Sequence, residues 1–350
     1  MNHDTTPAPL SPRPLRHLTE NQRQLMTSAQ LKAHGVGAAA VQEQCRAGGP
    51  WQQLLPGVYL LHPGRPTNEE RLHAVLLYAS RAPERRGRPD GVPAQHTPGR
   101  PAYAEAVVSG LAALALHGFS AAPPLTSLDH IDVLVPRTRR LRSTGFARLI
   151  RTNALPTPVQ RTGVPVAPVP RALADTVAQL SDAGAVRRLL TEAVRSGHCE
   201  PAAVVRELSQ ARLLARPHVV DAVDSLLAEG RSIAEDQLYA MVREHALPDP
   251  LWNVDLRLPG GPHLGGVDAF WPDHAVAVEL DVRAPRLDGE ATQGGRLRKR
   301  EHLERLGITV VHIAPKKLRE SLERQAAVVR TALMASGDRD PAAYVVVLPR

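Results

Sequence analysis

The chain has 350 residues, which is enough for two or three domains, and its hydrophobic content of 43% is enough to build their cores. Its formal net charge of +8 favours a polyanionic partner. Aromatic residues make up only 3% of the chain, which argues against a stacking platform for single strands and favours phosphate contacts to double-stranded DNA.

Neither the apolar runs nor the cysteines point to a membrane or secreted protein. No apolar run reaches membrane-spanning length, so we expect no membrane partner. The two cysteines, Cys45 and Cys199, lie far apart, and neither has His or Cys at metal-ligand spacing. A disulfide framework is therefore not expected, which suits a reducing cytoplasm.

The N-terminal part predicts a winged helix-turn-helix over 21–65, after a disordered lead over 1–20. Thr27 and Gln30 form a capping-box pattern that opens a short helix over 28–34. A second helix is predicted over 37–47, and a hairpin follows with strands over 51–55 and 58–62. Two short helices and then a hairpin is the order of a winged helix.

In that fold the second helix enters the major groove of DNA. Its predicted outward side chains are Gln42, Gln44 and Arg46. Gln can pair with adenine, and Arg with guanine or phosphate. The alternative is a structural module of two helices and a hairpin that binds protein.

A family resemblance supports the DNA-binding alternative. The segment TSAQLKAHGV…WQQLLPGVYLL resembles the N-terminal winged-helix domain of type IV toxin–antitoxin antitoxins of the AbiEi family. The matching positions are Thr27, Ala29, Leu31, Gly35, Val36, Trp51 and the turn Pro56-Gly57-Val58-Tyr59. The resemblance implies promoter binding, repression of the protein's own operon and a cognate nucleotidyltransferase-like toxin as partner.

The middle of the chain predicts two segments, 66–104 and 105–228. The first is a helix over 69–80 followed by a basic Pro/Gly-rich linker. Within the second, residues 105–180 resemble the central part of the same antitoxin-like proteins. The segment is predicted to have a helix over 109–117, strands over 131–136 and 146–151, and helices over 172–227. Between the strands lies a basic loop that either contacts DNA phosphate or is merely solvated, with Arg137, Arg139, Arg140 and Arg142.

The C-terminal part, 229–336, carries the main chemical signal. A helix over 231–246 is predicted to begin at Ser232, with Glu235 completing a capping box. Glu235 would lie on the apolar, sheet-facing stripe, where a carboxylate needs a partner. Two strands follow, over 264–270 and 276–281, joined by a turn over 271–274.

Acidic residues on these two strands predict a metal site. If Phe270 pairs with Ala275, Asp268 lies diagonal to Glu279 on one face, and Asp281 shares that face. Carboxylates at that separation can share Mg²⁺ or Mn²⁺, and such metals usually act on phosphates. A basic helix with Arg298 and Lys299 follows, and then the strand over 308–314, which makes a parallel crossover.

This element order, helix, three strands, helix and strand, resembles the PD-(D/E)XK nuclease fold, and more closely the domains related to very-short-patch repair endonucleases. The resemblance covers 231–335. It implies Asp268 and Glu279 as metal ligands, Glu235 as a supporting acid and Asp281 in the position usually held by Lys. Arg298 or Lys299 would then stabilise charge on the phosphate in place of that Lys.

Two features depart from the family pattern. Such domains commonly read E-x-D-G followed shortly by His, whereas Val282 replaces the Gly here and the next His is His302. These departures, with Asp281 in place of Lys, favour a non-catalytic relative.

The sequence therefore predicts an α/β multidomain protein. It has an N-terminal winged helix-turn-helix, an α/β middle and a restriction-endonuclease-like αβββαβ core. An amphipathic helix over 318–333 should cover the sheet, and a tail over 337–350 contains a β-prone run over 344–348.

Three functions remain open at this stage. The first is Mg²⁺-dependent DNA phosphodiester cleavage. The second is a transcriptional regulator or antitoxin without cleavage. The third is a protein-interaction scaffold whose basic charge has no nucleic-acid role.

Overall fold

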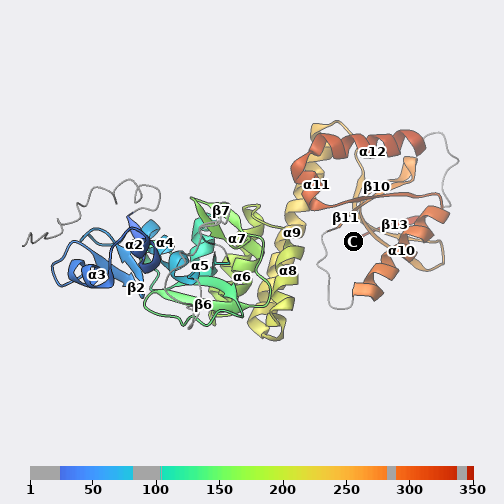
Figure 1. Cartoon of the computed structure of the whole chain (residues 1–350). Coiled ribbons are helices and arrows are strands. Elements are labelled where there is room, and N and C mark those ends of the chain that lie inside the picture. The colour runs from blue at the N-terminus through green and yellow to red at the C-terminus, as the bar shows by residue number, and fades with distance from the viewer. Residues whose placement is uncertain (1–23, 82–102, 104, 282–288, 337–344) are drawn as a thin grey trace, which may run out of the picture. The chain divides into compact units, whose positions relative to one another are not determined.

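The structure is a computed structural model that describes residues 24–81, 103, 105–281, 289–336 and 345–350. The chain divides into two compact units, Met1–Gln179 and Leu180–Arg350 (Figure 1). The predicted lead over 1–20, most of the basic linker and position 282 lie outside the described residues. Within those residues, no helix combines the length and the apolar character that crossing a bilayer requires.

The first unit begins with two short helices and a small antiparallel sheet in the order β1-β3-β2. Its elements are β1 (Leu25–Thr27), α2 (Ser28–Ala33), α3 (Ala38–Gln44), β2 (Gln52–Leu55) and β3 (Val58–Leu60). The predicted capping box is confirmed, since the Thr27 hydroxyl accepts from the Gln30 amide and the Gln30 side chain accepts from the Thr27 amide. Met26, Leu31 and Val41 form the buried core of this module.

The second helix of the pair is shorter than predicted. Helix α3 ends at Gln44 with Cys45 as its C-cap, whereas the prediction ran to residue 47. Arg46 therefore follows the helix instead of lying on its outward face. The reason is local, because the helix is stopped by the turn that leads through Gly48 and Gly49, and Gly48 has a φ of 79° that favours glycine.

The rest of the first unit is an α/β layer built on a five-stranded sheet in the order β6-β5-β4-β8-β7. Its elements are α4 (Asn68–Ala79), β4 (Val107–Ser109), α5 (Gly110–Leu116), η2 (Leu125–Ser127), β5 (Ile131–Pro136), β6 (Ala147–Thr152), β7 (Val159–Arg161), β8 (Val164–Val166) and α6 (Val169–Val177). The predicted helices near 69–80 and 109–117 and both predicted strands are confirmed.

The second unit begins with helices α7 (Ala183–Arg195), α8 (Pro201–Gln210), η3 (Leu213–Ala215) and α9 (Pro217–Glu244). Helix α9 runs unbroken for 28 residues. The predicted helix start at Ser232 is therefore wrong, and Ser232 is an interior residue. Buried residues continue with helical spacing on both sides of it, from Val219 and Leu226 to Ala234 and Leu238, so packing along the whole stripe outweighs the local cap signal.

A mixed five-stranded sheet follows α9, in the order β12-β11-β10-β9-β13. The remaining elements are β9 (Leu251–Arg257), β10 (His263–Trp271), η4 (Pro272–His274), β11 (Val276–Leu280), α10 (Gly289–Arg305), β12 (Thr309–Ile313), α11 (Pro315–Glu320), α12 (Leu322–Ser336) and β13 (Val346–Pro349). The predicted order of helix, three strands, helix and strand is confirmed. Strands β11 and β12 are parallel, as the crossover requires, and β9, β10 and β11 are antiparallel neighbours.

The register between β10 and β11 differs from the predicted one by two residues. Phe270 pairs with Ala277 instead of Ala275. The turn starts one residue later than predicted because Trp271 stays in the strand, where it is 2% exposed and its indole donates to the Pro248 carbonyl at 2.7 Å. Because the shift is even, no side chain changes face.

Two hydrophobic cores cover the two faces of this sheet, and Figure 1 shows α12 and α10 on opposite sides of its strands. One core joins Trp271 and Val278 to residues of α9, α11 and α12, while the other joins Phe270 and Ala277 to Leu303 of α10. The predicted helix over 318–333 does cover the sheet, but it is broken after Glu320. Ser321 is extended there, and its hydroxyl accepts from the Arg324 amide at 3.2 Å.

The end of the chain adds an edge strand to the sheet. Strand β13 pairs antiparallel with β9, with Val347 opposite Leu256. The β-prone run of the tail therefore forms a strand, which brings the residue after it, Arg350, against the centre of the unit.

Candidate functional site

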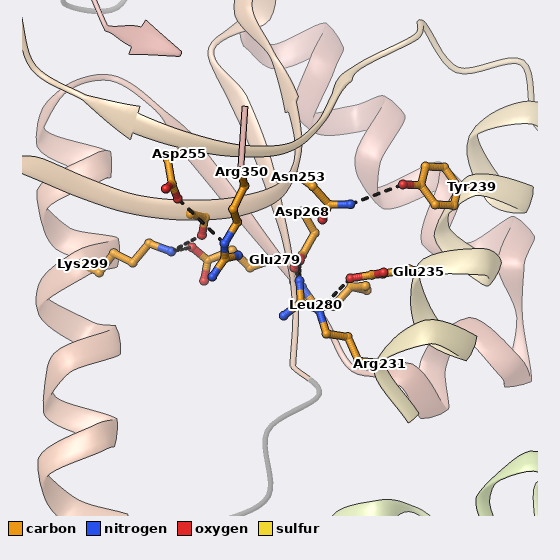
Figure 2. Close-up of polar contacts among 11 residues, drawn as sticks. Arg231, Glu235, Tyr239, Asn253, Asp255, Asp268, Glu279, Leu280, Lys299 and Arg350 are labelled. Atoms are coloured by element: carbon orange, nitrogen blue, oxygen red, sulfur yellow. Dashed lines mark hydrogen bonds and ion pairs between the residues drawn. The ribbon is translucent and has the colours of Figure 1, made fainter. Parts of the chain in front are cut away.

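Two facing carboxylates form the centre of the candidate site, one on each of two neighbouring strands (Figure 2). The β10–β11 pairing ends with Ala269 opposite Val278, and Asp268 and Glu279 are the next residues outward on the two strands. The charge of Glu279 acts on the Asp268 carboxyl, so the two predicted metal ligands are near neighbours.

Asp268 is held by two hydrogen bonds, one to each carboxylate oxygen. Its Oδ1 accepts from Arg231 Nη2 at 2.7 Å, and its Oδ2 accepts from the Leu280 amide at 2.6 Å. It is only 8% exposed, and burial raises its pKa. That effect outweighs the Leu280 amide and the Arg231 charge, which lower the pKa, while the charges of Glu235 and Glu279 raise it further.

Glu279 contacts basic side chains from a helix and from the next strand. Lys299 of α10 forms an ion pair with it, and His312 lies opposite it on β12 with Nδ1 3.6 Å from Oε2. Lys299 also donates to the Gly266 carbonyl at 2.7 Å. The Lys299 side chain crosses β10 at Gly265, where a Cβ would lie 2.6 Å from Lys299 Cε. Gly265 also has a φ of 120°, so the position suits only glycine.

Arg231 lies between Glu235 and Asp268 and donates a hydrogen bond to each of them. Arg231 Nε donates to Glu235 Oε1 at 2.6 Å, four residues along α9, while its Nη2 reaches Asp268. This confirms that the carboxylate on the sheet-facing side has a partner, which is a guanidinium. Glu235 is therefore linked to Asp268 through one shared cation.

The other two predicted residues of this site lie at its edge. Asp281 follows β11 and is exposed, and its amide donates to the Ile313 carbonyl at 2.9 Å. Arg298 is exposed on α10, one residue before Lys299. Of the two candidates for the missing Lys, only Lys299 contacts one of the facing acids.

The two carboxylates fit a small hard cation in their chemistry and position. Mg²⁺ is usually held by one or two carboxylates, and the remaining ligands are waters and substrate phosphates. Within the described part of the chain, no group of three His, Cys, Asp or Glu side chains converges in metal-ligand geometry. A metal at Asp268 and Glu279 would thus have two protein ligands, and it would compete with Arg231 and Lys299 for their oxygens.

Several residues around the site were not predicted from the sequence. Arg231 lies four residues before Glu235, a spacing at which ion pairs form on helices, so the sequence did carry a signal for this pair. His312 lies in the apolar strand predicted over 308–314, and a single histidine there is only a weak indication of a site residue. Asn253 of β9 is opposite Asp268, has a φ of 49° and donates to the Tyr239 hydroxyl at 3.4 Å, and nothing in its local sequence indicated this.

A cavity of about 550 Å³ opens between α9 and β9. Tyr239 and Trp252 form part of its wall, with ring centroids 4.2 Å apart. Other lining residues include Asp236, Arg243, Leu247 and Asp249. The cavity therefore adjoins the helix that carries Arg231 and Glu235, but the facing acids do not line it.

The residues predicted to bind DNA in the first unit differ in their exposure and in their pairing with other side chains. Gln42 is exposed on α3 and Gln44 is half-buried at its end, while Arg46 is paired with Glu43 at 2.5 Å. In the loop after β5, Arg137 and Arg140 are exposed. Arg139 is instead held in the protein, where its Nη2 donates to Glu105 and its Nη1 to the Arg81 carbonyl, both at 2.7 Å.

Neither protein-family models nor curated proteins match this chain. Its function is therefore inferred from the side chains that the fold brings together.

Proposed function

We propose that this protein binds double-stranded DNA in the cytoplasm and that its second unit hydrolyses phosphodiester bonds with a divalent metal, Mg²⁺ or Mn²⁺. The observation that carries the proposal is the pair Asp268 and Glu279, the next residues outward from the last β10–β11 pair, with a lysine against one of them. The element order around them matches that of the PD-(D/E)XK nuclease fold, which supports the same assignment.

In this proposal Asp268 and Glu279 hold the metal. The bound ion would polarise the scissile phosphate and lower the pKa of its attacking water. Lys299 would have to give up its pairing with Glu279 in the metal-bound protein, while its stem stays across Gly265 and its Nζ lies 2.7 Å from the Gly266 carbonyl. Lys299 would then be positioned to stabilise negative charge on the phosphate, the role of the Lys that Asp281 replaces.

Arg231 and Glu235 act on Asp268 in this scheme, not on the substrate. The guanidinium fixes the position of Oδ1, and Glu235 orients the guanidinium in turn. Residues that orient a metal ligand in this way typically change metal affinity or activity by roughly 10- to 100-fold when they are removed.

The test is cleavage of supercoiled and mismatched duplex DNA with Mg²⁺ or Mn²⁺ by the wild type and by Glu279→Gln. Metal-dependent nicking should occur with the wild type and disappear in the variant. Glu304→Gln is the matched control, because Glu304 is also a glutamate paired with a basic residue of α10, at 2.7 Å from Arg300, but it is exposed. Equal nicking by the wild type and Glu279→Gln would refute the assignment of the site.

A second function, a transcriptional regulator or antitoxin without cleavage, is favoured by the first unit. The sequence of helices α2 and α3 and the β2–β3 hairpin suits a winged helix, and Gln42 is exposed on the second helix. Sequence-selective binding to the DNA upstream of the protein's own gene, lost in Gln42→Ala and without any metal-dependent cleavage by the wild type, would support this function and replace the first. In that case a nucleotidyltransferase-like toxin is the proposed partner.

A further inference from the structure

The edge strand β13 ends beside the facing acids and delivers one more cation to them. The amide of Arg350 donates to the Asn253 carbonyl at 3.1 Å, which fixes the backbone of Arg350 beside the residue of β9 that lies opposite Asp268. Figure 2 shows the Arg350 side chain extending toward Glu279 and Lys299. A residue remote in sequence from the acids therefore reaches the site through sheet pairing alone.

Two adjacent glycines of β10 make room for two cations. Lys299 crosses the strand at Gly265, and the Arg350 guanidinium lies over Gly266. A Cβ at Gly266 would stand 2.7 Å from Asp255 Oδ1, 2.8 Å from Arg350 Nη1 and 2.9 Å from its Cζ. Any larger residue at this position would push both the guanidinium and its acidic partner away, so the bare backbone is what permits their placement.

The Arg350 guanidinium has little to hold it there. Its acidic partner is Asp255, and the closest approach, between Nε and Oδ1, is 3.9 Å, which is too long for a hydrogen bond. Asp255 is shared with His263 at 3.4 Å. The Arg350 side chain is 42% exposed, so a solute can reach it from solvent.

We propose that Arg350 binds a phosphate of the DNA strand that is held at the facing acids. A guanidinium matches a phosphate with two parallel hydrogen bonds, and Arg350 offers such a fork beside Glu279 and Lys299 (Figure 2). Lys299 would contact the phosphate at the metal, and Arg350 a neighbouring phosphate of the same backbone. This inference rests on the proposed function, because it takes nucleic acid as the substrate.

The experiment measures binding of the full chain to a labelled DNA duplex over a range of salt concentrations, in EDTA so that no metal-dependent cleavage occurs. Arg350→Gln removes the charge, and Gly266→Ala keeps the charge but displaces the guanidinium. Lys316→Gln is the control for loss of one positive charge, since Lys316 is 66% exposed on α11, which covers the other face of the sheet. Thermal unfolding of each variant shows whether it is folded.

Arg350→Gln should weaken binding roughly tenfold at low salt and reduce the slope of log K against log salt by about 1, as expected for one lost phosphate contact. Gly266→Ala should change both in the same direction, and Lys316→Gln should change neither by as much. Arg350→Gln behaving like Lys316→Gln would overturn the inference, as would a wild type that binds no duplex.

The same proteins tested for metal-dependent cleavage separate this inference from the proposed function. A changed salt slope in Arg350→Gln, with no cleavage by the wild type, would support the phosphate contact and refute the hydrolase. Cleavage by the wild type with an unchanged slope would do the reverse.

Discussion

At the scale of single residues, Asp268 is the group whose protonation matters most. It is buried between two other carboxylates, and the single guanidinium of Arg231 is shared with one of them. Burial raises its pKa in the folded protein above the ordinary value of about 4 for an aspartate in the unfolded chain. The ionised form is therefore less favourable in the folded protein than in the unfolded chain.

The first prediction follows from the sign of that change. A raised folded-state pKa stabilises the protein fully below about pH 4, and this contribution is lost as the pH rises through the raised value. The wild type should therefore lose stability relative to Asp268→Asn over this window and show a constant difference above it. The measurement is the free energy of unfolding in urea at pH values from about 4 to 8, without metal.

Asp249→Asn provides the control for this prediction, because Asp249 is exposed. Its difference from the wild type should not follow the same pH course. A pH-independent difference for Asp268→Asn would show that the carboxylate titrates as it does in the unfolded chain.

The second prediction concerns the cation bound to Glu279. Lys299→Met leaves this carboxylate mostly buried without its lysine partner and should destabilise the metal-free protein by roughly 2 kcal/mol. Mg²⁺ or Mn²⁺ should recover part of that loss, because a metal can neutralise the same carboxylate. The measurement is thermal unfolding with and without each ion, for the wild type and the variant.

Lys316→Met is the matched control, as its ion pair with Glu320 is exposed and spans 3.5 Å. It should cost little, and the ions should not affect it differently from the wild type. If the ions stabilise Lys299→Met no more than the wild type, then Glu279 is not a metal ligand.

How much of the site could be predicted depends on the range of the interactions. The Thr27–Gln30 cap needed only neighbouring residues, and it was predicted correctly. The alternation along β11 placed Glu279 and Asp281 on one face, but the register depended on Trp271 reaching the Pro248 carbonyl, a tertiary contact. The pairing of Lys299 with Glu279 and the place of Arg350 depend on packing across the whole sheet, and no local pattern specifies them.

At the scale of elements, helix α9 joins the helical part of the second unit to its sheet. Its first half packs against α7, and its second half contributes Leu238, Met241 and Val242 to the core beneath β10 and β11. Arg231 and Glu235 lie between these halves. Because the helix is continuous, both residues are held by rigid backbone on either side, and neither lies in a frayed first turn.

The third prediction tests this continuity. If Ser232 were an N-cap, replacing it with Ala would cost about 1 kcal/mol. In the middle of α9, where Ser232 is exposed, the same replacement should be neutral or should stabilise the protein by a few tenths of a kcal/mol. The measurement is the free energy of unfolding in urea.

Thr67→Ala is the comparison variant, because the Thr67 hydroxyl caps α4 by accepting from the Glu70 amide at 3.2 Å. It should show the cost that Ser232→Ala lacks. Similar losses for the two variants would mean that α9 is interrupted before Ser232.

At the scale of the whole molecule, the second unit contains everything that the proposed hydrolysis needs. Both faces of its sheet are covered by its own helices, and the edge strand β13 comes from its own sequence. Five acidic and basic residues of the candidate site all belong to this unit: Arg231, Glu235, Asp268, Glu279 and Lys299.

The fourth prediction is that residues 180–350 fold and act without the first unit. This fragment should unfold in one cooperative transition and nick DNA in a metal-dependent manner, with Glu279→Gln inactive in this setting too. Circular dichroism during heating and the plasmid nicking assay provide the measurements. A fragment that is unfolded, or folded but inactive while the full chain cleaves, would show that the first unit completes the second.

The Arg231 guanidinium and the Lys299 ammonium already form ion pairs with the acids of the site. These acids therefore have counter-ions before any solute binds. In the proposed function, a divalent ion would enter this site by exchange, displacing side-chain cations that are covalently tethered beside the carboxylates. Before that exchange the acids would repel an approaching polyanion only weakly, because their charge is offset locally. The proposal therefore implies an order of binding, with the DNA backbone first and the metal second.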